Sequence, residues 1–111
     1  MSRKIKFRVW DRKKIHNPKL YNFEDVGNDI VLMQYTGLKD KNRKEIYEGD
    51  IIKKDPLAGI YYSVIFEEGR YKLFGKDAWG DYNRDIDIYW HTYEIIGNIY
   101  ENPELVKEIM L

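Results

Sequence analysis

The sequence predicts a single, mainly β domain over residues 1–111: a small barrel or barrel-like sandwich of short strands with a short C-terminal helix. Three observations support this prediction. A chain of 111 residues suits one domain with a real core. Aromatic residues make up 15% of the chain, including ten Tyr and three Trp, and such side chains favour strands. Gly, Asp and Asn recur between the apolar runs, where they favour turns.

The first strand is expected at residues 4–10, where charged and apolar side chains alternate. Successive side chains of a strand point to opposite faces of a sheet, so Ile5, Phe7 and Val9 are expected to face the core. The basic side chains are expected on the outer face: Lys4, Lys6 and Arg8. Residues 11–17 are predicted to form a turn.

The middle of the chain predicts a strand, a polar turn and a tight corner. Residues 29–36 contain a nearly continuous apolar run and are expected to form a central strand. Asp40 and Asn42 favour a turn, because their side chains hydrogen-bond to nearby backbone groups. Residues 46–54 are expected to continue the sheet. They contain a Glu-Gly-Asp corner at residues 48–50, in which Gly49 is expected to adopt a positive φ.

A hairpin and a loop are predicted next. Residues 60–67 and 70–75 flank a Glu-Gly dipeptide, which favours a tight reverse turn between two strands. Residues 76–85 are mostly polar and are expected to form a loop that contains Trp79.

The C-terminal part predicts the last strands and a helix. Residues 86–100 are expected to complete the sheet. Asn102, Pro103 and Glu104 have the order of a cap, a first-turn proline and a first-turn acid, which predicts a helix over residues 103–110. Short strands leave unpaired edges, and closure of the sheet or self-association covers them.

Overall composition narrows the class of protein. The chain has 19 basic and 19 acidic residues and no cysteine, which excludes disulfides and thiolate metal sites. No apolar run approaches the roughly 18 residues of a membrane span, and the first residues form no apolar signal region. We therefore expect a soluble, cytoplasmic protein without a membrane partner.

The charges are unevenly spread, basic near the N-terminus and acidic near the C-terminus. One interpretation is that two solvated strand edges pair with each other. The other is a nucleic-acid site whose cations contact phosphates, so that affinity falls steeply as salt is raised. The zero balance makes phosphate binding less favourable. The cations of this alternative site are Arg3, Lys4, Lys6, Arg8 and Lys13.

No catalytic or cofactor-binding motif is present, so we expect no enzyme activity, no cofactor and no metal. His16 is expected in an exposed turn, and His91 on a strand as a structural hydrogen-bond former. Asp85 and Asp87 would share one strand face near Asp81, and clustered carboxylates can hold Mg²⁺ or Ca²⁺. A solvated acidic face explains this short pattern better. A metal-dependent enzyme that uses the acidic cluster with His91 stays open as an alternative.

The second half contains more aromatic side chains than a domain of this size must bury. Partly exposed Tyr and Trp residues on a β scaffold are typical of a protein interface or of a stacking platform for single-stranded nucleic acid. A stacking platform has interleaved cations, whereas acidic residues outnumber basic ones after Gly80. We therefore expect a homo-oligomer whose interface contains Trp79, Tyr82 and Tyr89.

Three blocks of sequence form a recognisable set: IKFRVWD at residues 5–11, the stretch 32–52, and EIIGNIYENPEL at residues 94–105. In content and order they resemble the YopX family of small phage and prophage proteins. Arg43 departs from the family pattern, because a turn glycine is common at its place. The resemblance implies the family's fold and a phage-related origin. It implies no activity, since the family has no established biochemical role and no assigned catalytic residues.

Together these observations favour a phage- or prophage-encoded, non-enzymatic protein of the host cytoplasm. It would self-associate and act by binding another macromolecule, such as a host or phage protein. A nucleic-acid-binding module that uses the basic first strand is the main alternative, and a metal-dependent enzyme is the second.

Overall fold

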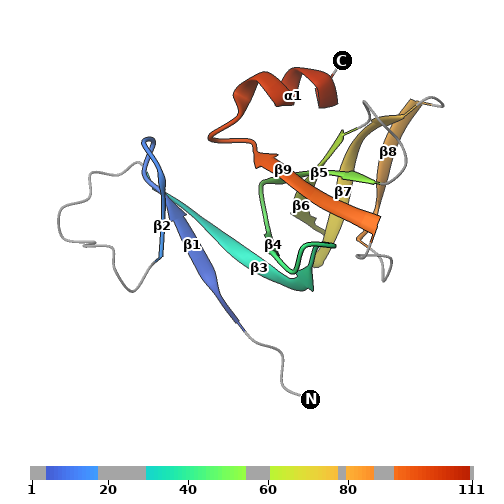
Figure 1. Ribbon diagram of the computed structural model, residues 1–111. Helices are drawn as coiled ribbons and strands as arrows, with labels where there is room; N and C mark the ends of the chain where they lie inside the picture. The colour runs from blue at the N-terminus through green and yellow to red at the C-terminus, as the bar shows by residue number, and fades with distance from the viewer. Residues whose placement is uncertain (1–4, 18–29, 55–60, 78–79, 87–91, 111) are drawn as a thin grey trace.

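The structure, a computed structural model, describes residues 5–17, 30–54, 61–77, 80–86 and 92–110. In this part of the chain nine strands form two antiparallel sheets, and one helix follows them (Figure 1). The sheets are curled and form a half-barrel. The predicted mainly β fold with a short C-terminal helix is confirmed.

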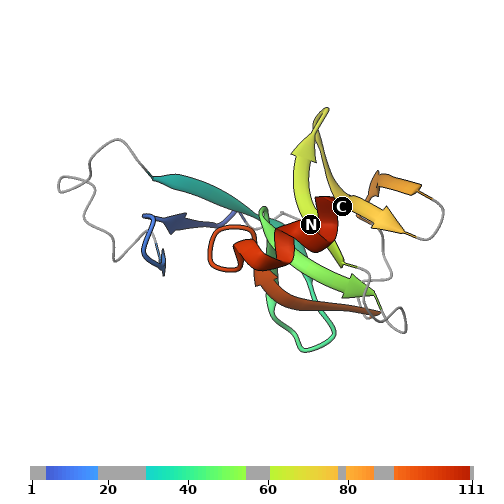
Figure 2. The same cartoon turned by 90° about the horizontal axis from the view of Figure 1, so that it is seen from above.

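The first sheet has the strand order β2-β1-β3-β4. Its strands are β1 (Phe7–Trp10), β2 (Ile15–His16), β3 (Val31–Lys39) and β4 (Glu45–Tyr47). The first half of β3 pairs with β1, and the second half pairs with β4. We call residues 5–16 and 31–34 the arm, because this narrow ribbon extends to one side of the second sheet in Figures 1 and 2.

The second sheet has the strand order β8-β7-β6-β5-β9. Its strands are β5 (Asp50–Lys54), β6 (Tyr61–Glu67), β7 (Arg70–Asp77), β8 (Gly80–Asp85) and β9 (Tyr93–Asn98). The turn between β6 and β7 consists of Glu68 and Gly69, whose φ angles are 55° and 78°. Two successive positive φ angles are typical of the type I′ turn, whose twist matches that of paired strands. The predicted hairpin is confirmed.

The core lies between the second sheet and the adjoining end of the first sheet. Its buried residues are Ile46, Ile52, Tyr62, Val64, Leu73 and Tyr93. Burial of one large apolar side chain stabilises a fold by about 1.5–3 kcal/mol. The arm contributes none of these residues, so other contacts must fix its position.

The helix α1 (Pro103–Met110) has the bounds that the sequence predicts. Its first turn closes with a hydrogen bond of 3.0 Å from the Leu105 N–H to the Asn102 carbonyl. The Asn102 side chain accepts a hydrogen bond of 3.1 Å from the Asn98 N–H, so it ties the start of the helix to the end of β9. α1 lies against β6 and β7, and no described helix has the length and apolar composition needed to cross a membrane.

Two predictions about local structure are wrong. Residues 76–85 do not form a polar loop, because they contain the end of β7 and the whole of β8. The pairing of Lys72 with Asp85 through Asp77 with Gly80 depends on backbone groups, so this edge strand forms with few apolar side chains. Residues 11–17 are not only a turn, since they contain β2.

The orientation of the first strand also differs from the prediction. Val9 is buried as expected, but Ile5 and Phe7 are 68% and 43% exposed. Arg8 faces inward, and its side chain is only 17% exposed. The physical reason is a buried carboxylate, Asp50, which requires a cation more strongly than the core requires Phe7.

The turn between β1 and β2 depends on Asp11. Its Oδ1 atom accepts hydrogen bonds from the backbone N–H groups of Lys13 and Lys14, at 2.9 and 3.0 Å. Its Oδ2 atom lies 2.6 Å from Nε2 of His16, which is a half-buried strand residue rather than the exposed turn residue expected. The backbone hydrogen bonds from Lys14 and Lys13 are the main cause of the lowered pKa of Asp11, about 2.

The corner before β5 provides a test of crowding. Gly49 has a φ of +85°, as predicted, and a Cβ atom there would lie 3.2 Å from Cε2 of Tyr100 and 3.3 Å from Sδ of Met33. Gly69 has a similar φ of +78° but open space around it. We expect Gly49→Ala to lower the free energy of unfolding by about 1–3 kcal/mol, and Gly69→Ala by about 1 kcal/mol or less. Urea unfolding measures both, and equal losses would show that the contacts around Gly49 are unimportant.

The lowered pKa of Asp11 predicts a pH dependence. A carboxyl group whose pKa is lower in the folded state stabilises that state above its unfolded value, and the contribution is lost as the pH falls through the folded value. For Asp11 this range runs from 3.8 down to about 2. Asp11→Asn should therefore lose less stability than the wild type on acidification through this range. Urea unfolding across the range measures the difference, and parallel curves would contradict the prediction.

Candidate functional site

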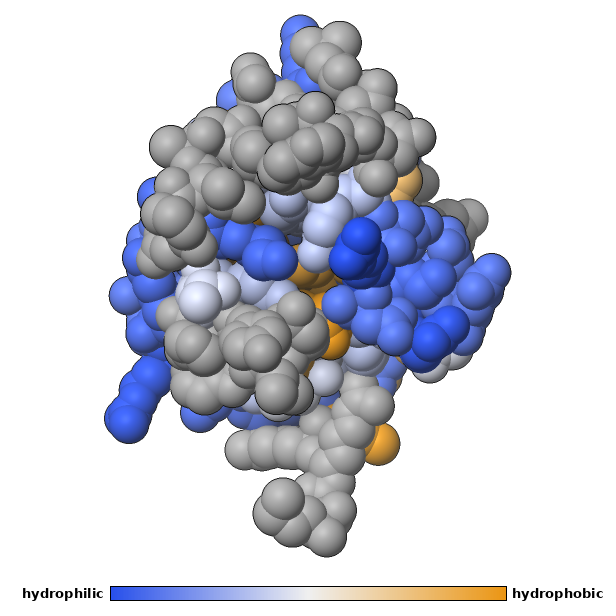
Figure 3. All heavy atoms as spheres, turned by 90° about the vertical axis from the view of Figure 1, so that its right-hand side faces the viewer, coloured by the Kyte–Doolittle hydropathy of each residue, from blue (hydrophilic) through white to orange (hydrophobic). Residues whose placement is uncertain are grey.

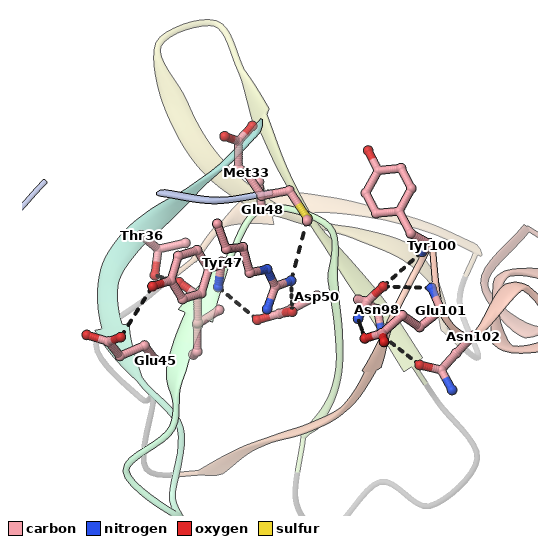
Figure 4. Close-up of polar contacts among 12 residues, drawn as sticks. Met33, Thr36, Glu45, Tyr47, Glu48, Asp50, Asn98, Tyr100, Glu101 and Asn102 are labelled. Atoms are coloured by element: carbon pink, nitrogen blue, oxygen red, sulfur yellow. Dashed lines mark hydrogen bonds and ion pairs between the residues drawn. The ribbon is translucent and has the colours of Figure 1, made fainter. Parts of the chain in front are cut away.

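The most highly organised polar site lies where β1 and β3 meet the start of β5. Asp50 is 1% exposed there, and its Oδ1 atom accepts a charge-assisted hydrogen bond from Nη2 of Arg8. Its Oδ2 atom accepts a hydrogen bond of 2.8 Å from the Tyr47 N–H, as Figure 4 shows. Both carboxylate oxygens are thus satisfied, one by the arm and one by the strand before the corner.

Burial has the largest influence on this carboxylate. It raises the pKa of Asp50, while the Arg8 guanidinium and the Tyr47 N–H act in the opposite direction. The guanidinium also lies over the Tyr47 ring, 4.7 Å from its centroid, which favours the cation further. The Asp50 carboxylate is therefore used to hold two strands together, and it is closed to solvent.

The same junction continues toward the C-terminal helix. The rings of Trp10 on the arm and Tyr100 after β9 stack with centroids 5.9 Å apart. The backbone of Gly49 connects the corner to β6 and to the segment after β9, because its N–H donates to the Val64 carbonyl and its carbonyl accepts from the Ile99 N–H, both at 2.8 Å. The base of the arm is therefore fixed by its contacts with Asp50, with the Tyr47 ring and with Tyr100.

Asp40 forms a second buried connection between the sheets and is 0% exposed. Its carboxylate accepts three backbone hydrogen bonds: from Asn42 at 2.8 Å, Lys44 at 2.9 Å and Ile95 at 3.0 Å. The first two hold the turn between β3 and β4, and the third attaches that turn to β9. In this turn Arg43 has a φ of 66°, which glycine adopts without strain. That conformation accounts for the glycine that is common at this place in the resembling family.

The cations of the predicted nucleic-acid site are differently placed. Nζ of Lys6 lies 2.7 Å from Oε2 of Glu45, and Arg8 is paired with Asp50. Lys13 is exposed at the turn of the arm. Arg3 and Lys4 lie outside the described residues. The ion partners of the first strand thus come from the middle of the chain rather than from its acidic C-terminal part.

The aromatic residues predicted at an interface fall partly within the structure. Tyr82 lies on β8, and its ring packs 4.6 Å from that of Tyr62 in the core. Nζ of Lys54 lies 3.4 Å from its hydroxyl oxygen. Trp79 and Tyr89 lie outside the described residues. The described residues on the side of the molecule that carries β8 are mainly hydrophilic, with only a narrow hydrophobic strip (Figure 3).

Of the acidic cluster, only the side chain of Asp85 falls within the described residues. Asp85 on β8 forms an exposed ion pair of 3.1 Å with Arg70 on β7. The described part does not include the Asp81 side chain, nor any atom of Asp87 or His91. Among the residues that are described, no three His, Asp or Glu side chains lie close enough to hold a metal ion.

Sequence reasoning missed the role of Asp50, although a signal was present. Asp50 directly precedes Ile51 and Ile52, two apolar residues of a strand that is buried on both faces, and it is itself buried at the start of that strand. Such a carboxylate needs a partner, and an arginine on another strand is the strongest one available.

Comparison with known proteins places the chain in a family. Residues 5–107 match the family described as YopX protein. The chain belongs to the YopX family. The crystal structure of protein EF1440 from Enterococcus faecalis has a TM-score of 0.62 and 27% sequence identity, and the match covers 95% of this chain and 99% of that one. No curated protein matches the sequence.

A second crystal structure has the same fold. The protein yopX from Bacillus subtilis has a TM-score of 0.57 and 22% identity, over 89% of this chain and 93% of that one. The resemblance in the three blocks of sequence is thus confirmed. These YopX-family structures support the fold and leave the activity open.

The buried pair at the junction gives a test of what holds the arm. Arg8→Ala leaves Asp50 as an unpaired buried charge and should lower the free energy of unfolding by about 3 kcal/mol. Arg70→Ala is the matched control, because it breaks an ion pair whose side chains are 59% and 51% exposed. It should cost less than about 1 kcal/mol. Urea unfolding compares the two, and a similar loss for both would remove the special role of Asp50.

Two substitutions test whether Tyr82 contributes to the core: one removes its ring, and the other removes only its hydroxyl group. Tyr82→Ala takes a ring from the side of the core and should cost about 1–3 kcal/mol. Tyr82→Phe keeps the packing on Tyr62 and should cost well under that, since it loses only a long contact with Lys54. Thermal unfolding of the two variants measures the difference. An unchanged melting temperature for Tyr82→Ala would return this residue to the candidate interface.

Proposed function

We propose that this YopX-family chain is a non-enzymatic binding or assembly protein that self-associates and contacts another macromolecule. The observation that carries the proposal is the group of exposed apolar side chains on the arm. Ile5, Phe7 and Leu32 are 68%, 43% and 52% exposed. Grouped exposed apolar side chains are typical of surfaces that a partner covers.

The register of the arm explains why these side chains point outward. Leu32 lies opposite Val9, and Phe7 lies two residues before Val9, so all three share one face of the ribbon. Arg8 and Met33, which lie opposite each other, point to the other face, which is turned toward Asp50. Because Arg8 must reach Asp50, Phe7, Val9 and Leu32 lie on the opposite face. This face is covered at Val9, which is 0% exposed, and open to solvent at Phe7 and Leu32.

The proposal includes a phage or prophage origin and a place in the cytoplasm of the host cell. The resemblance of three sequence blocks to a phage-associated family supports the first part. The absence of cysteine from the chain supports a cytoplasmic location, because proteins of a reducing compartment rarely contain disulfides.

The exposed residues of the arm change which surface is the better candidate for the interface. Trp79 and Tyr89 keep their place in it on sequence grounds alone. Tyr82 is less well supported, because its ring packs against the core. The outer face of the arm, with Phe7 and Leu32, is the better-supported contact surface.

Nucleic-acid binding is a weaker candidate function. Lys6 and Arg8 are engaged by Glu45 and Asp50, so contact with phosphates would compete with ion pairs that hold the arm. The observation that favours nucleic-acid binding is the exposure of Lys13 and its neighbour Lys14. A metal-dependent enzyme has the least support, because Asp85 is paired with Arg70.

Self-association is tested by sedimentation velocity over a range of micromolar concentrations. The wild type is expected to sediment above its monomer mass of 13.4 kDa, with the mass rising with concentration. Leu32→Ser should weaken this association without lowering the melting temperature, because the side chain is 52% exposed. A monomer at every concentration would assign the exposed face to a different macromolecule and end the self-association part of the proposal.

A further inference from the structure

We propose that copies of this chain assemble head to tail, with the arm of one copy seated on the β6–β7 hairpin of the next. This inference rests on the proposed self-association and names its two surfaces. The hairpin surface consists of residues 66–70, where β6 ends, the chain turns and β7 begins.

Exposed apolar side chains mark the two surfaces. In the described part of the chain, every exposed large hydrophobic side chain lies on one or the other. The arm has Ile5, Phe7 and Leu32, and the hairpin has Phe66, which is 52% exposed. The Phe66 ring packs on Tyr71 with centroids 4.9 Å apart, so it is held in a fixed orientation. A fixed, half-exposed aromatic ring is an effective anchor in an interface.

The arm carries positive charge beside its apolar face. Arg12, Lys13 and Lys14 are all exposed in the turn between β1 and β2. The nearby carboxylate of Asp11 is already engaged by two backbone N–H groups. The end of the arm is therefore a cationic rim next to Leu32.

Two carboxylates lie beside the aromatic ring of the hairpin, and the cation of this surface, Arg70, is paired with Asp85 on β8. The side chains of Glu67 and Glu68 are 48% and 71% exposed. Nζ of Lys72 lies 3.4 and 3.6 Å from them, but this side chain is only 11% exposed, so it contacts the carboxylates from the inner side. The carboxylates keep solvent-facing surface that a cation from another molecule can approach.

Charge decides which surfaces meet. Contact between two arms would bring Lys13 and Lys14 of two copies together, and contact between two hairpins would do the same for Glu67 and Glu68. Contact between an arm and a hairpin pairs opposite charges around an apolar centre, which favours encounter and excludes the like pairings. The net charge of zero agrees with a chain that carries both halves of its own interface.

The direction of the two surfaces sets the kind of assembly. In Figure 2 the arm extends to the left, and the β6–β7 hairpin points to the top of the view. A contact between different surfaces of identical chains is heterologous, so it repeats from copy to copy. Repetition produces a closed ring if the rotation between copies closes, and an open filament if it does not.

Two variants each remove one surface. The arm variant carries Leu32→Ser with Lys13→Glu, and the hairpin variant carries Phe66→Ser with Glu68→Lys. Each side chain is exposed, and circular dichroism with thermal unfolding checks that both variants fold. Alone, each should associate at least about tenfold more weakly than the wild type in sedimentation velocity.

The decisive experiment mixes the two variants in equal amounts. The hairpin of the arm variant and the arm of the hairpin variant are both intact, so one full contact can form. The two altered surfaces keep opposite charges but lack Leu32 and Phe66, so a further copy is added much more weakly. A discrete dimer of one copy of each variant is the expected product. A second chain that carries Lys13→Glu together with Glu68→Lys tests charge pairing without loss of apolar surface. It should assemble more tightly than Lys13→Glu alone or Glu68→Lys alone. Each single change places like charges across the contact, whereas the two together place opposite charges there again.

The outcomes separate this inference from the proposed function. A wild type that assembles, variants that do not, and a mixed dimer support head-to-tail contact. A wild type that assembles while the mixture stays monomeric, or while either variant assembles as the wild type does, overturns this contact and leaves self-association standing. A wild type that is monomeric at all concentrations overturns both. If the arm or hairpin variant fails to fold, the chain with Lys13→Glu and Glu68→Lys decides: assembly no tighter than that of Lys13→Glu alone or Glu68→Lys alone rejects the contact.

Discussion

The structure depends on the burial of two carboxylates, Asp40 and Asp50, where its two sheets meet. A buried carboxylate is costly unless hydrogen bonds or a cation compensate it, so each recruits groups from distant parts of the chain. Asp50 takes Arg8 from 42 residues away, and Asp40 takes the Ile95 N–H from 55 residues away. These contacts tie the first sheet to the second at two places, and they position an arm whose buried residues, Val9 and Met33, lie outside the central cluster.

Features set by residues close together in the sequence could be predicted, and features set by distant residues could not. The positive φ of Gly49, the Glu-Gly hairpin turn and the start of the helix after Asn102 are decided by neighbouring residues, and all three are confirmed. The existence of β8 depends on backbone pairing with β7, which few apolar side chains signal. The inward orientation of Arg8 depends on Asp50, which alternation within the first strand cannot reveal. At the candidate site, sequence predicted the corner but not the ion pair that makes it a junction.

The demands of folding also determine what remains for binding. Lys6 and Arg8 are engaged by Glu45 and Asp50, so the face of the first strand that carries them is ionic and faces the body of the molecule. On the opposite face Val9 stays buried, whereas Ile5 and Phe7 are exposed. The surface that the fold leaves exposed is apolar with a basic rim. Such a surface suits a protein partner better than a nucleic-acid backbone, because apolar contact supplies the affinity and charge supplies the selectivity.

Polar anchoring of the arm has a consequence for assembly. A ribbon held through an apolar core can slide, since apolar contacts have little directional preference. The Arg8–Asp50 pair, the hydrogen bond from Tyr47 and the stack of Trp10 on Tyr100 are directional, so they fix the angle between the arm and the body. In a head-to-tail contact this angle is repeated at every copy, and together with the geometry of the contact it decides whether the rotation closes after a few copies. The buried carboxylate that holds one chain together thus also sets the geometry with which chains can join.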